Sequence, residues 1–315
     1  YLYLAEKLGV EIMPEQEVQD IRPLEDGGYQ LTVRKSTGMK RPIQKLQAEK
    51  VILSGGVMGT VKLLMQCKNK GSLDNISPKL GDFVRTNSEA IIGVKLKKTP
   101  QEDFSKGVAI SAGFHPDEKT HIETVRYGKG QTAMALLTTL LSDRKIPLPG
   151  LIRWGISVIR APLQFIANFF PFNWARKTII LLVMQPIDNY LKLNYKPRWW
   201  RLGGFSMNSQ SSTGKKIPSH IPIGEKTAHT IMSKTGGTIL TTYMDSIFDI
   251  PTTAHILGGA CLGKNKDSGV IDENFEMFNY PGMYIIDGSV VPTNLGVNPS
   301  LTITALAEYA MSRFP

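Results

Sequence analysis

The first 90 residues alternate between short apolar runs and turn residues, which predicts short strands interspersed with helices. An apolar helical face over residues 2–8 ends at Gly9, as expected for a helix C-terminus. The Asp26-Gly27-Gly28 turn then predicts a hairpin between two strands. Residues 51–67 read as a short buried strand, a tight glycine turn and a helix.

Residues 91–250 carry a different pattern. Alternating stretches such as GVAISAGF, HIETVRYG and TIILLVMQ are typical of an antiparallel sheet. From Pro251 the glycine-rich, short-strand character returns, and the chain closes on a helical pattern over residues 300–313. We therefore expect a mixed α/β (α+β) chain in which one domain, 1–90 and 251–315, is interrupted by another, 91–250.

Aromatic residues gather between residues 151 and 177, where they raise the question of a membrane contact. The longest uncharged run there, residues 161–175, is shorter than the ~20 residues that span a bilayer, and Pro162 and Pro171 interrupt it. Two interpretations stay open: a buried helix or lid, or a loop that dips into a membrane or admits substrate.

Composition and net charge exclude some classes of partner and of bound metal. The formal net charge is +10, but the 37 Lys and Arg residues are spread along the chain rather than gathered on one helix, which argues against a nucleic-acid partner. A basic surface also favours a transient contact with an anionic membrane surface. Cys67 and Cys261 lie far apart with no CxxC partner, so we expect buried thiols and no metal site.

The last quarter of the chain holds the strongest candidate chemistry. In MYIIDGS, Asp287 and Gly288 follow an apolar strand, at the edge where open sheets present ligands. Asn298 and Pro299 come directly before the helix that Ser300 begins, so the first-turn N–H groups form a positive dipole end. The alternative is that Asn298 and Ser300 are ordinary helix caps.

Taken together, residues 255–308, with His-x-x-Gly-Gly, Asp-Gly-Ser and Asn-Pro, resemble the C-terminal signature of the glucose-methanol-choline (GMC) oxidoreductases, most closely the cholesterol oxidase branch. The resemblance implies that 1–90 and 251–315 form an FAD/NAD(P)-binding Rossmann-like domain and 91–250 the substrate domain. It also places His255 and Asn298 at the substrate hydroxyl beside FAD, with His255 assisting proton removal.

The same resemblance assigns further positions. Asp287 and Gly288, with the Asn298-Pro299-Ser300 step, match cofactor contacts, and VILSGGVMGTVKLL looks like the family's second glycine turn, in which Gly56 is the best candidate. Val18 matches a position along the adenine. Glu123 matches a catalytic carboxylate that shifts the steroid double bond, with an exposed strand glutamate as the alternative.

Two histidines near Glu123, His115 and His121, have no evident partner in the sequence and are interpreted as structural. The family's GxGxxG turn, which cradles the FAD pyrophosphate, is absent from this sequence. The chain also begins without Met, so we expect a C-terminal fragment, and the cellular compartment is not predictable from it.

The leading hypothesis is an FAD-dependent oxidation of a 3β-hydroxysteroid, or a similarly bulky secondary alcohol, with O2 as acceptor and H2O2 as product. Double-bond isomerisation is expected to follow. Two alternatives stay open: a dehydrogenase that passes electrons from another bulky alcohol to a non-oxygen acceptor, and an inactive lipid-binding remnant.

Overall fold

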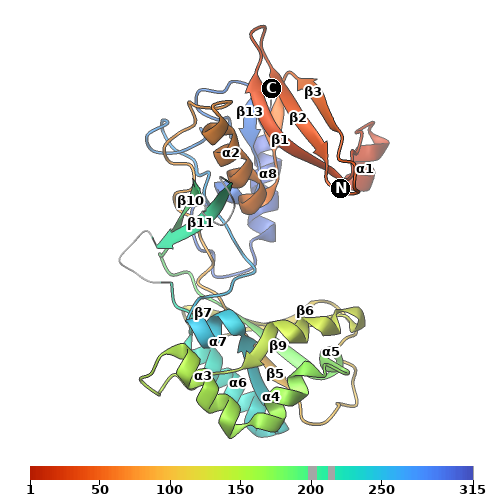
Figure 1. Cartoon of the computed structure of the whole chain (residues 1–315), viewed down its shortest axis with the longest axis vertical. Coiled ribbons are helices and arrows are strands. Elements are labelled where there is room, and N and C mark those ends of the chain that lie inside the picture. The colour runs from red at the N-terminus through yellow and green to blue at the C-terminus, as the bar shows by residue number, and fades with distance from the viewer. Residues whose placement is uncertain (198–203, 212–216, 315) are drawn as a thin grey trace.

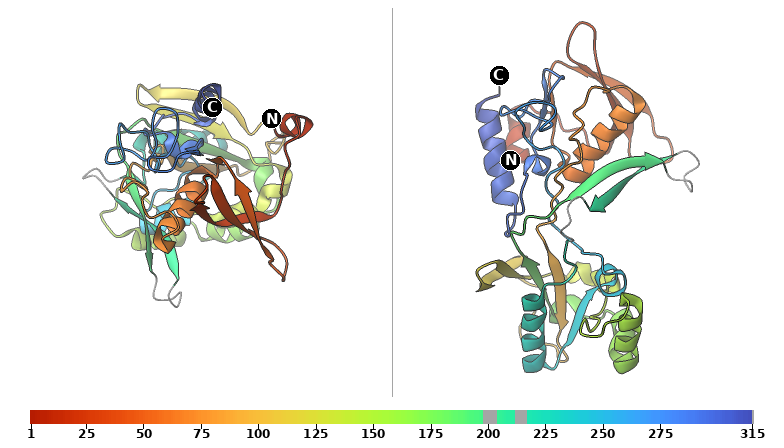
Figure 2. Two further views of the ribbon diagram at one scale, coloured as in Figure 1. Left: turned by 90° about the horizontal axis from the view of Figure 1, so that it is seen from above. Right: turned by 90° about the vertical axis from the view of Figure 1, so that its left-hand side faces the viewer.

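The protein, seen here in a computed structural model, consists of two bodies joined by a narrow waist (Figures 1 and 2). The structure describes residues 1–197, 204–211 and 217–314. Both termini lie in the upper body of Figure 1, and the chain passes between the bodies several times. The mixed helix and sheet class expected from the sequence is confirmed.

The upper body combines a three-stranded antiparallel sheet, in the order β1-β2-β3, with a short parallel pair, β4 and β13. Its core is one apolar cluster that includes Leu64, Phe275 and Ile285. The elements are α1 (Leu2–Lys7), β1 (Gln16–Pro23), β2 (Tyr29–Lys35), β3 (Ile43–Ala48), β4 (Val51–Leu53), the π-helix η1 (Val57–Val61), α2 (Lys62–Lys70), β10 (Leu191–Pro197), β11 (Phe205–Ser211), β13 (Met283–Ile285), the 3-10 turn η4 (Gly288–Val290) and α8 (Ser300–Ser312).

The lower body is built on a six-stranded antiparallel sheet in the order β6-β7-β9-β5-β12-β8. Helix α6 packs closely on this sheet at Gly224, where an added Cβ would come within 2.7 Å of Val183. The elements are β5 (Ala90–Lys95), β6 (Ile110–Asp117), β7 (Thr120–Val125), the 3-10 segment η2 (Lys129–Leu137), β8 (Thr138–Leu140), α3 (Gly150–Arg160), α4 (Pro162–Phe169), α5 (Trp174–Lys177), β9 (Thr178–Met184), α6 (Pro222–Thr235), β12 (Thr238–Thr242) and α7 (Tyr243–Phe248).

The β10-β11 hairpin lies inside the range expected for the substrate domain, yet it packs with the upper body (Figure 1). Leu193 is buried in the upper core, and Leu191, Tyr195 and Met207 pack against that core. The alternating pattern of these strands predicts a half-buried hairpin but does not indicate which core it covers. The sequence division at residues 90 and 250 therefore misses one return of the chain to the first body.

The glycine turn after β4 also differs in detail from the expectation. The helix begins at Val57 as a π-helical turn and ends at Lys70, where Gly71 closes it in the left-handed conformation. Single π-turns inside helices are frequent at functional sites. Cys67 and Cys261 are buried, as predicted, and burial raises the pKa of each thiol to about 11.

The aromatic segment between residues 151 and 177 is helical, with Pro162 at the start of α4. It is only partly buried: Trp174 lies in the core, whereas the outer surface of α3, α4 and the loop after them is apolar and exposed. Among the described helices, none is long and apolar enough to cross a bilayer.

Candidate active site

His255 is held by a buried carboxylate that the sequence analysis did not single out. The Glu89 side chain is fully buried, and its Oε2 lies 3.0 Å from His255 Nδ1. The Thr253 hydroxyl and the Ala254 amide also donate to Glu89. Because a carboxylate accepts hydrogen bonds, Nδ1 carries the proton and Nε2 carries the lone pair. The arrangement therefore presents His255 Nε2 as a proton acceptor.

Asn298 meets Glu123 across the waist. The Asn298 amide nitrogen donates to both carboxylate oxygens of Glu123, at 3.0 and 2.8 Å, and this contact fixes which end of the amide is nitrogen. Glu123 is only 7% exposed, so the alternative of an exposed strand glutamate is wrong. The Asn298 carbonyl oxygen is buried and lacks a hydrogen-bond partner among the described residues. A group that donates one hydrogen bond would satisfy it.

The structure supplies partners for His115 and His121 that the sequence did not reveal. His121 Nε2 lies 2.9 Å from Glu123 Oε1, and His121 Nδ1 lies 3.0 Å from His115 Nε2. Residues 121 and 123 are two apart on β7, so their side chains emerge on the same face of the strand. Predicting a strand here was therefore enough to predict the contact of His121 with Glu123. The contact with His115 depends on the pairing of β6 and β7.

One short segment connects His255 with Asn298. The Asn87 side chain donates to the Val297 carbonyl and accepts from the Gly296 amide, which clamps the two residues before Asn298. Two positions after Asn87, Glu89 holds His255. No hydrogen bond between the described side chains joins His255 to Asn298 directly, so segment 87–89 is what fixes the two groups in one frame.

The Asp287 carboxylate is hydrogen-bonded to other residues of the protein. Its oxygens accept four hydrogen bonds: from the Gly56 amide at 2.9 Å, the Thr60 hydroxyl at 2.5 Å, and the amide and hydroxyl of Ser289 at 2.7 and 2.5 Å. A carboxylate offers about four acceptor positions, so these bonds use its capacity. Asp287 thus fastens the turn after β4 to the end of the parallel strand β13.

The start of α8 has no side-chain cap. Pro299 occupies the cap position and makes no capping hydrogen bond, and the Asn298 amide is engaged by Glu123 instead. The alternative of ordinary capping by Asn298 is therefore wrong. The first-turn N–H groups of α8 keep the partial positive charge of a helix N-terminus.

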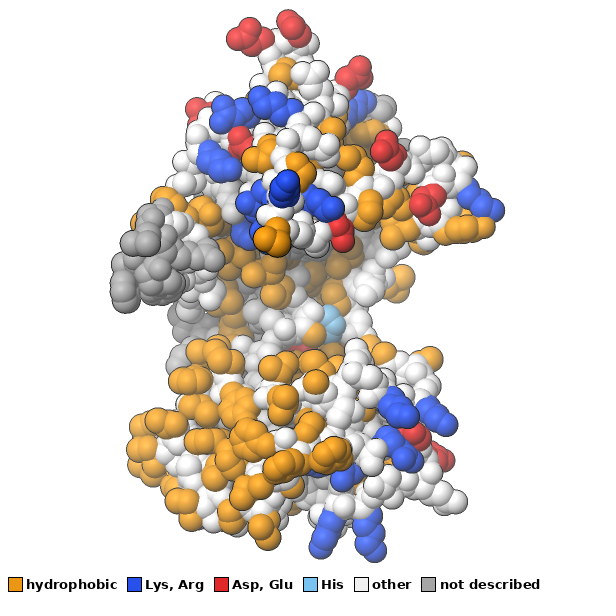
Figure 3. Space-filling view, turned by 45° about the vertical axis from the view of Figure 1, so that its right-hand side comes forward, with side chains coloured by type: hydrophobic (Ala, Val, Ile, Leu, Met, Phe, Trp, Pro, Cys, Tyr) orange, Lys and Arg blue, Asp and Glu red, His pale blue; other side chains and the backbone are white. Residues whose placement is uncertain are grey.

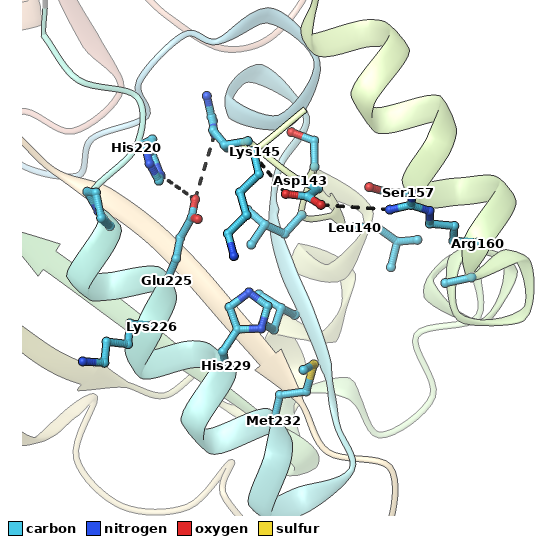
Figure 4. Close-up of a pocket in the computed structure, with 16 residues that line it drawn as sticks. Leu140, Asp143, Lys145, Ser157, Arg160, His220, Glu225, Lys226, His229 and Met232 are labelled. Atoms are coloured by element: carbon cyan, nitrogen blue, oxygen red, sulfur yellow. Dashed lines mark hydrogen bonds and ion pairs between the residues drawn. The ribbon is translucent and has the colours of Figure 1, made fainter. Parts of the chain in front are cut away.

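The surface is hollowed at the waist between the two bodies, with apolar side chains along the hollow (Figure 3). A separate cavity of about 970 Å³ lies in the lower body, between α6 and the loop after β8 (Figure 4). None of the predicted site residues lines it. Its polar side chains bind one another, since Glu225 contacts both His220 and Arg144. His255, Asn298 and Glu123 therefore lie outside this cavity.

Comparison with known proteins finds similarity to one group of enzymes. A cholesterol oxidase of Acinetobacter baumannii is 39% identical over 322 residues, covering all of this chain and 57% of that enzyme. A cholesterol oxidase of Mycobacterium tuberculosis is 39% identical over 321 residues, covering 55% of its length. The model of the GMC oxidoreductase family matches residues 217–307. Residues 217–307 thus match the GMC oxidoreductase family, and the whole chain is similar to these two cholesterol oxidases. It spans a little over half the length of the curated relatives that it matches.

Solved structures support the same fold. The formate oxidase of Aspergillus oryzae superposes with a TM-score of 0.56 at 15% identity, over 99% of this chain and 62% of that one. An FAD-dependent oxidoreductase of Chaetomium thermophilum gives a TM-score of 0.51 at 14% identity, over 99% of this chain and 63% of that one. The Chaetomium thermophilum enzyme is named as FAD-dependent.

Three features of the described residues fit FAD. The Asn298 carbonyl oxygen is a buried acceptor awaiting a donor. Gly56 has positive φ, and no atom lies within 4 Å of the position that a Cβ would take, which leaves the turn open to a bulky planar group. The uncapped start of α8 suits negative charge. The predicted cofactor contacts stay proposals; they are those of Gly56, Asp287, Gly288, Asn298, Pro299 and Ser300.

Val18 lies at a β-bulge in β1, where the pairing with β2 shifts between Val18 and Asp20. Its side chain packs against the upper core. A bulge leaves main-chain groups outside the ladder, which suits the proposed main-chain contact with the adenine.

Proposed function

We propose that the protein oxidises a 3β-hydroxysteroid, such as cholesterol, to the ketone with FAD as cofactor and O2 as acceptor, and then isomerises the double bond. The main support is structural. Segment 87–89 holds His255 and Asn298 in a fixed relative position, beside the buried Glu123. The 39% identity to two cholesterol oxidases over the whole chain supports the sterol as substrate.

In this proposal, His255 Nε2 is the atom that accepts the proton of the substrate hydroxyl. Glu89 keeps the Nδ1 proton in place, so Nε2 takes the proton from the substrate hydroxyl as the carbinol carbon is oxidised. FAD, when bound, supplies the acceptor for the hydride from that carbon. Asn298 offers a buried carbonyl oxygen that orients a hydrogen-bond donor at the site. The N-terminus of α8 stabilises negative charge that develops near it.

Glu123 is the base of the second reaction. It takes a proton from C4 of the 5-en-3-one and returns a proton to C6, which moves the double bond into conjugation with the ketone. The carboxylate lies in a water-poor position, at 7% exposure, where Asn298 and His121 hold it. A buried base of this kind favours proton transfer over loss of the proton to bulk water.

The exposed apolar surface of α3, α4 and the loop after them supports the predicted transient membrane contact, because a sterol must leave a bilayer to reach the site. The lower body shows a wide apolar surface in Figure 3. The exposed apolar side chains there are Leu151, Ile152, Ile159, Leu163, Ile166, Phe169, Phe170 and Phe172. Basic side chains, including Arg160 and Lys177, accompany them, as suits an anionic surface.

The proposal is tested with the full-length, flavin-loaded protein, supplied with cholesterol in detergent or in vesicles under air. We expect peroxide release together with the absorbance of the conjugated enone. The Glu123→Gln variant should still release peroxide but should form the enone much more slowly, because it has lost the carboxylate base.

The exposed Glu118→Gln change, on the turn between β6 and β7, is the matched control and should leave both products unchanged. Peroxide released with a long-chain primary alcohol but not with cholesterol would remove the sterol. An enone formed at the wild-type rate by Glu123→Gln would remove the assigned role of Glu123.

A further inference from the structure

Glu123 is the inner end of a chain of hydrogen bonds that leads to the surface. Asn298 donates to Glu123, Glu123 meets His121 Nε2 at 2.9 Å, and His121 Nδ1 meets His115 Nε2 at 3.0 Å. The two imidazole rings have centroids 4.5 Å apart. Each link is within hydrogen-bonding distance, so the contacts are continuous from the carboxylate to the outer histidine.

Burial falls along the chain. Glu123 has a side-chain exposure of 9%, His121 has 15%, and His115 belongs to the exposed class. The chain therefore begins in the water-poor interior and ends in solvent. Its direction matches that of a path for protons between a buried base and bulk water.

The fold makes room for this arrangement. Gly113 of β6 pairs with Glu123 of β7, and a Cβ at position 113 would lie 3.0 Å from the ring of His121. The pairing then slips between Phe114 and Asp117, at the strand segment that carries His115. On the other side, the β9 partner of His121 is Met184, which does not titrate. The bare backbone at Gly113 lets the His121 ring lie against β6.

We infer that His121 and His115 form a proton path that connects Glu123 with solvent, an inference that rests on the proposed role of Glu123 as the isomerisation base. One proton enters at His115 Nδ1, the His115 Nε2 proton passes to His121 Nδ1, and the His121 Nε2 proton passes to Glu123 Oε1. Atoms and charge balance, since one proton enters and one arrives. The reverse sequence returns Glu123 to its carboxylate form.

The path has a chemical use. Glu123 must be ionised when it attacks the C4 proton, yet it lies where direct contact with water is limited. A histidine can accept on one ring nitrogen and donate from the other, so two in series carry a proton without water entry. The two histidines are positioning and proton-transfer groups that act through Glu123 rather than on the reacting carbons.

The first test does not depend on turnover. Histidine ring nitrogens are labelled with ¹⁵N in the full-length, flavin-loaded protein, and their NMR shifts are compared between variants at one pH. Because Glu123 is hydrogen-bonded to His121 and His121 to His115, Glu123→Gln should move the ring ¹⁵N shifts of both histidines, whereas Glu118→Gln should move neither. Movement of His121 alone would mean that the connection to His115 is broken, which overturns the path.

The second test supplies cholest-5-en-3-one in D2O and measures deuterium at C6 of the conjugated product by mass spectrometry. The wild-type protein should incorporate solvent deuterium, and His121→Phe should lose most of that label while still isomerising. His115→Phe, at an exposed position that leaves the core intact, should show the same loss. Unchanged deuterium in both variants overturns the path.

The two tests separate failure of the inference from failure of the proposed function. A wild-type protein that does not isomerise the ketone contradicts the proposed role of Glu123, and the NMR comparison then decides alone whether the path exists. Isomerisation with full deuterium exchange in both histidine variants leaves the function in place and removes the path.

Discussion

Replacing Glu89 by Gln is expected to lower turnover by about 10³- to 10⁴-fold, as carboxylate-to-amide changes beside catalytic histidines can do. The Gln amide nitrogen would point its hydrogens at His255 Nδ1, so the ring proton would move to Nε2. The atom that should accept the hydroxyl proton would then carry one. Steady-state turnover with cholesterol, together with sterol binding to the oxidised protein, measures the effect.

The loss should fall on kcat, while sterol binding and the flavin spectrum stay close to wild type, because Glu89 is buried behind His255. Exchange of the exposed Glu118 for Gln again provides the matched control. A Glu89→Gln protein that keeps near wild-type turnover would show that His255 does not depend on this tautomer, and the assignment of His255 as the proton acceptor would be wrong.

Replacing Arg144 by Met is expected to lower the free energy of unfolding by about 3–5 kcal/mol, the usual cost of removing one partner from a buried ion pair. Arg144 joins the loop after β8 to α7, binding Asp245 at 2.6 Å and also Asp249. Asp245 is 8% exposed. Burial raises the pKa of Asp245 even with Arg144 beside it. In Arg144→Met the buried Asp245 carboxylate no longer has this cation beside it, which is the source of the expected loss of stability.

The sign of the pH dependence follows from that raised pKa. A carboxyl whose pKa is higher in the folded state than in the unfolded state lowers stability when it is ionised. This loss disappears as pH falls from above the folded-state pKa toward the unfolded-state pKa. The penalty of Arg144→Met should therefore be smaller at about pH 5 than near neutral pH. Urea unfolding at the two pH values, with Lys145→Met as the exposed neighbouring control, checks it. A pH-independent penalty would contradict the electrostatic origin.

Several parts of the fold and site could be read from sequence because they depend on local patterns. The strand at residues 51–53, the glycine turn after it and the helix from Ser300 all follow from periodicity and turn chemistry, and the structure has them within a few residues. The position of Asp287 after a short apolar strand was predictable for the same reason.

The contacts that organise the site were not predictable, because they join residues far apart in the chain. Glu89 lies 166 positions from His255, and nothing local marks it as the partner. Asn87 likewise acts on residues 296 and 297 through the tertiary fold. His121 was the exception: its two-residue spacing from Glu123 on one strand was a usable signal.

The most direct test of the account mixes the full-length, flavin-loaded protein with cholesterol in the absence of oxygen and follows the flavin absorbance. We expect cholesterol to bleach the oxidised flavin in the wild-type protein, and we expect His255→Ala to bind the sterol but to bleach far more slowly. A flavin that cholesterol does not bleach, or a His255→Ala protein that bleaches at the wild-type rate, would contradict it.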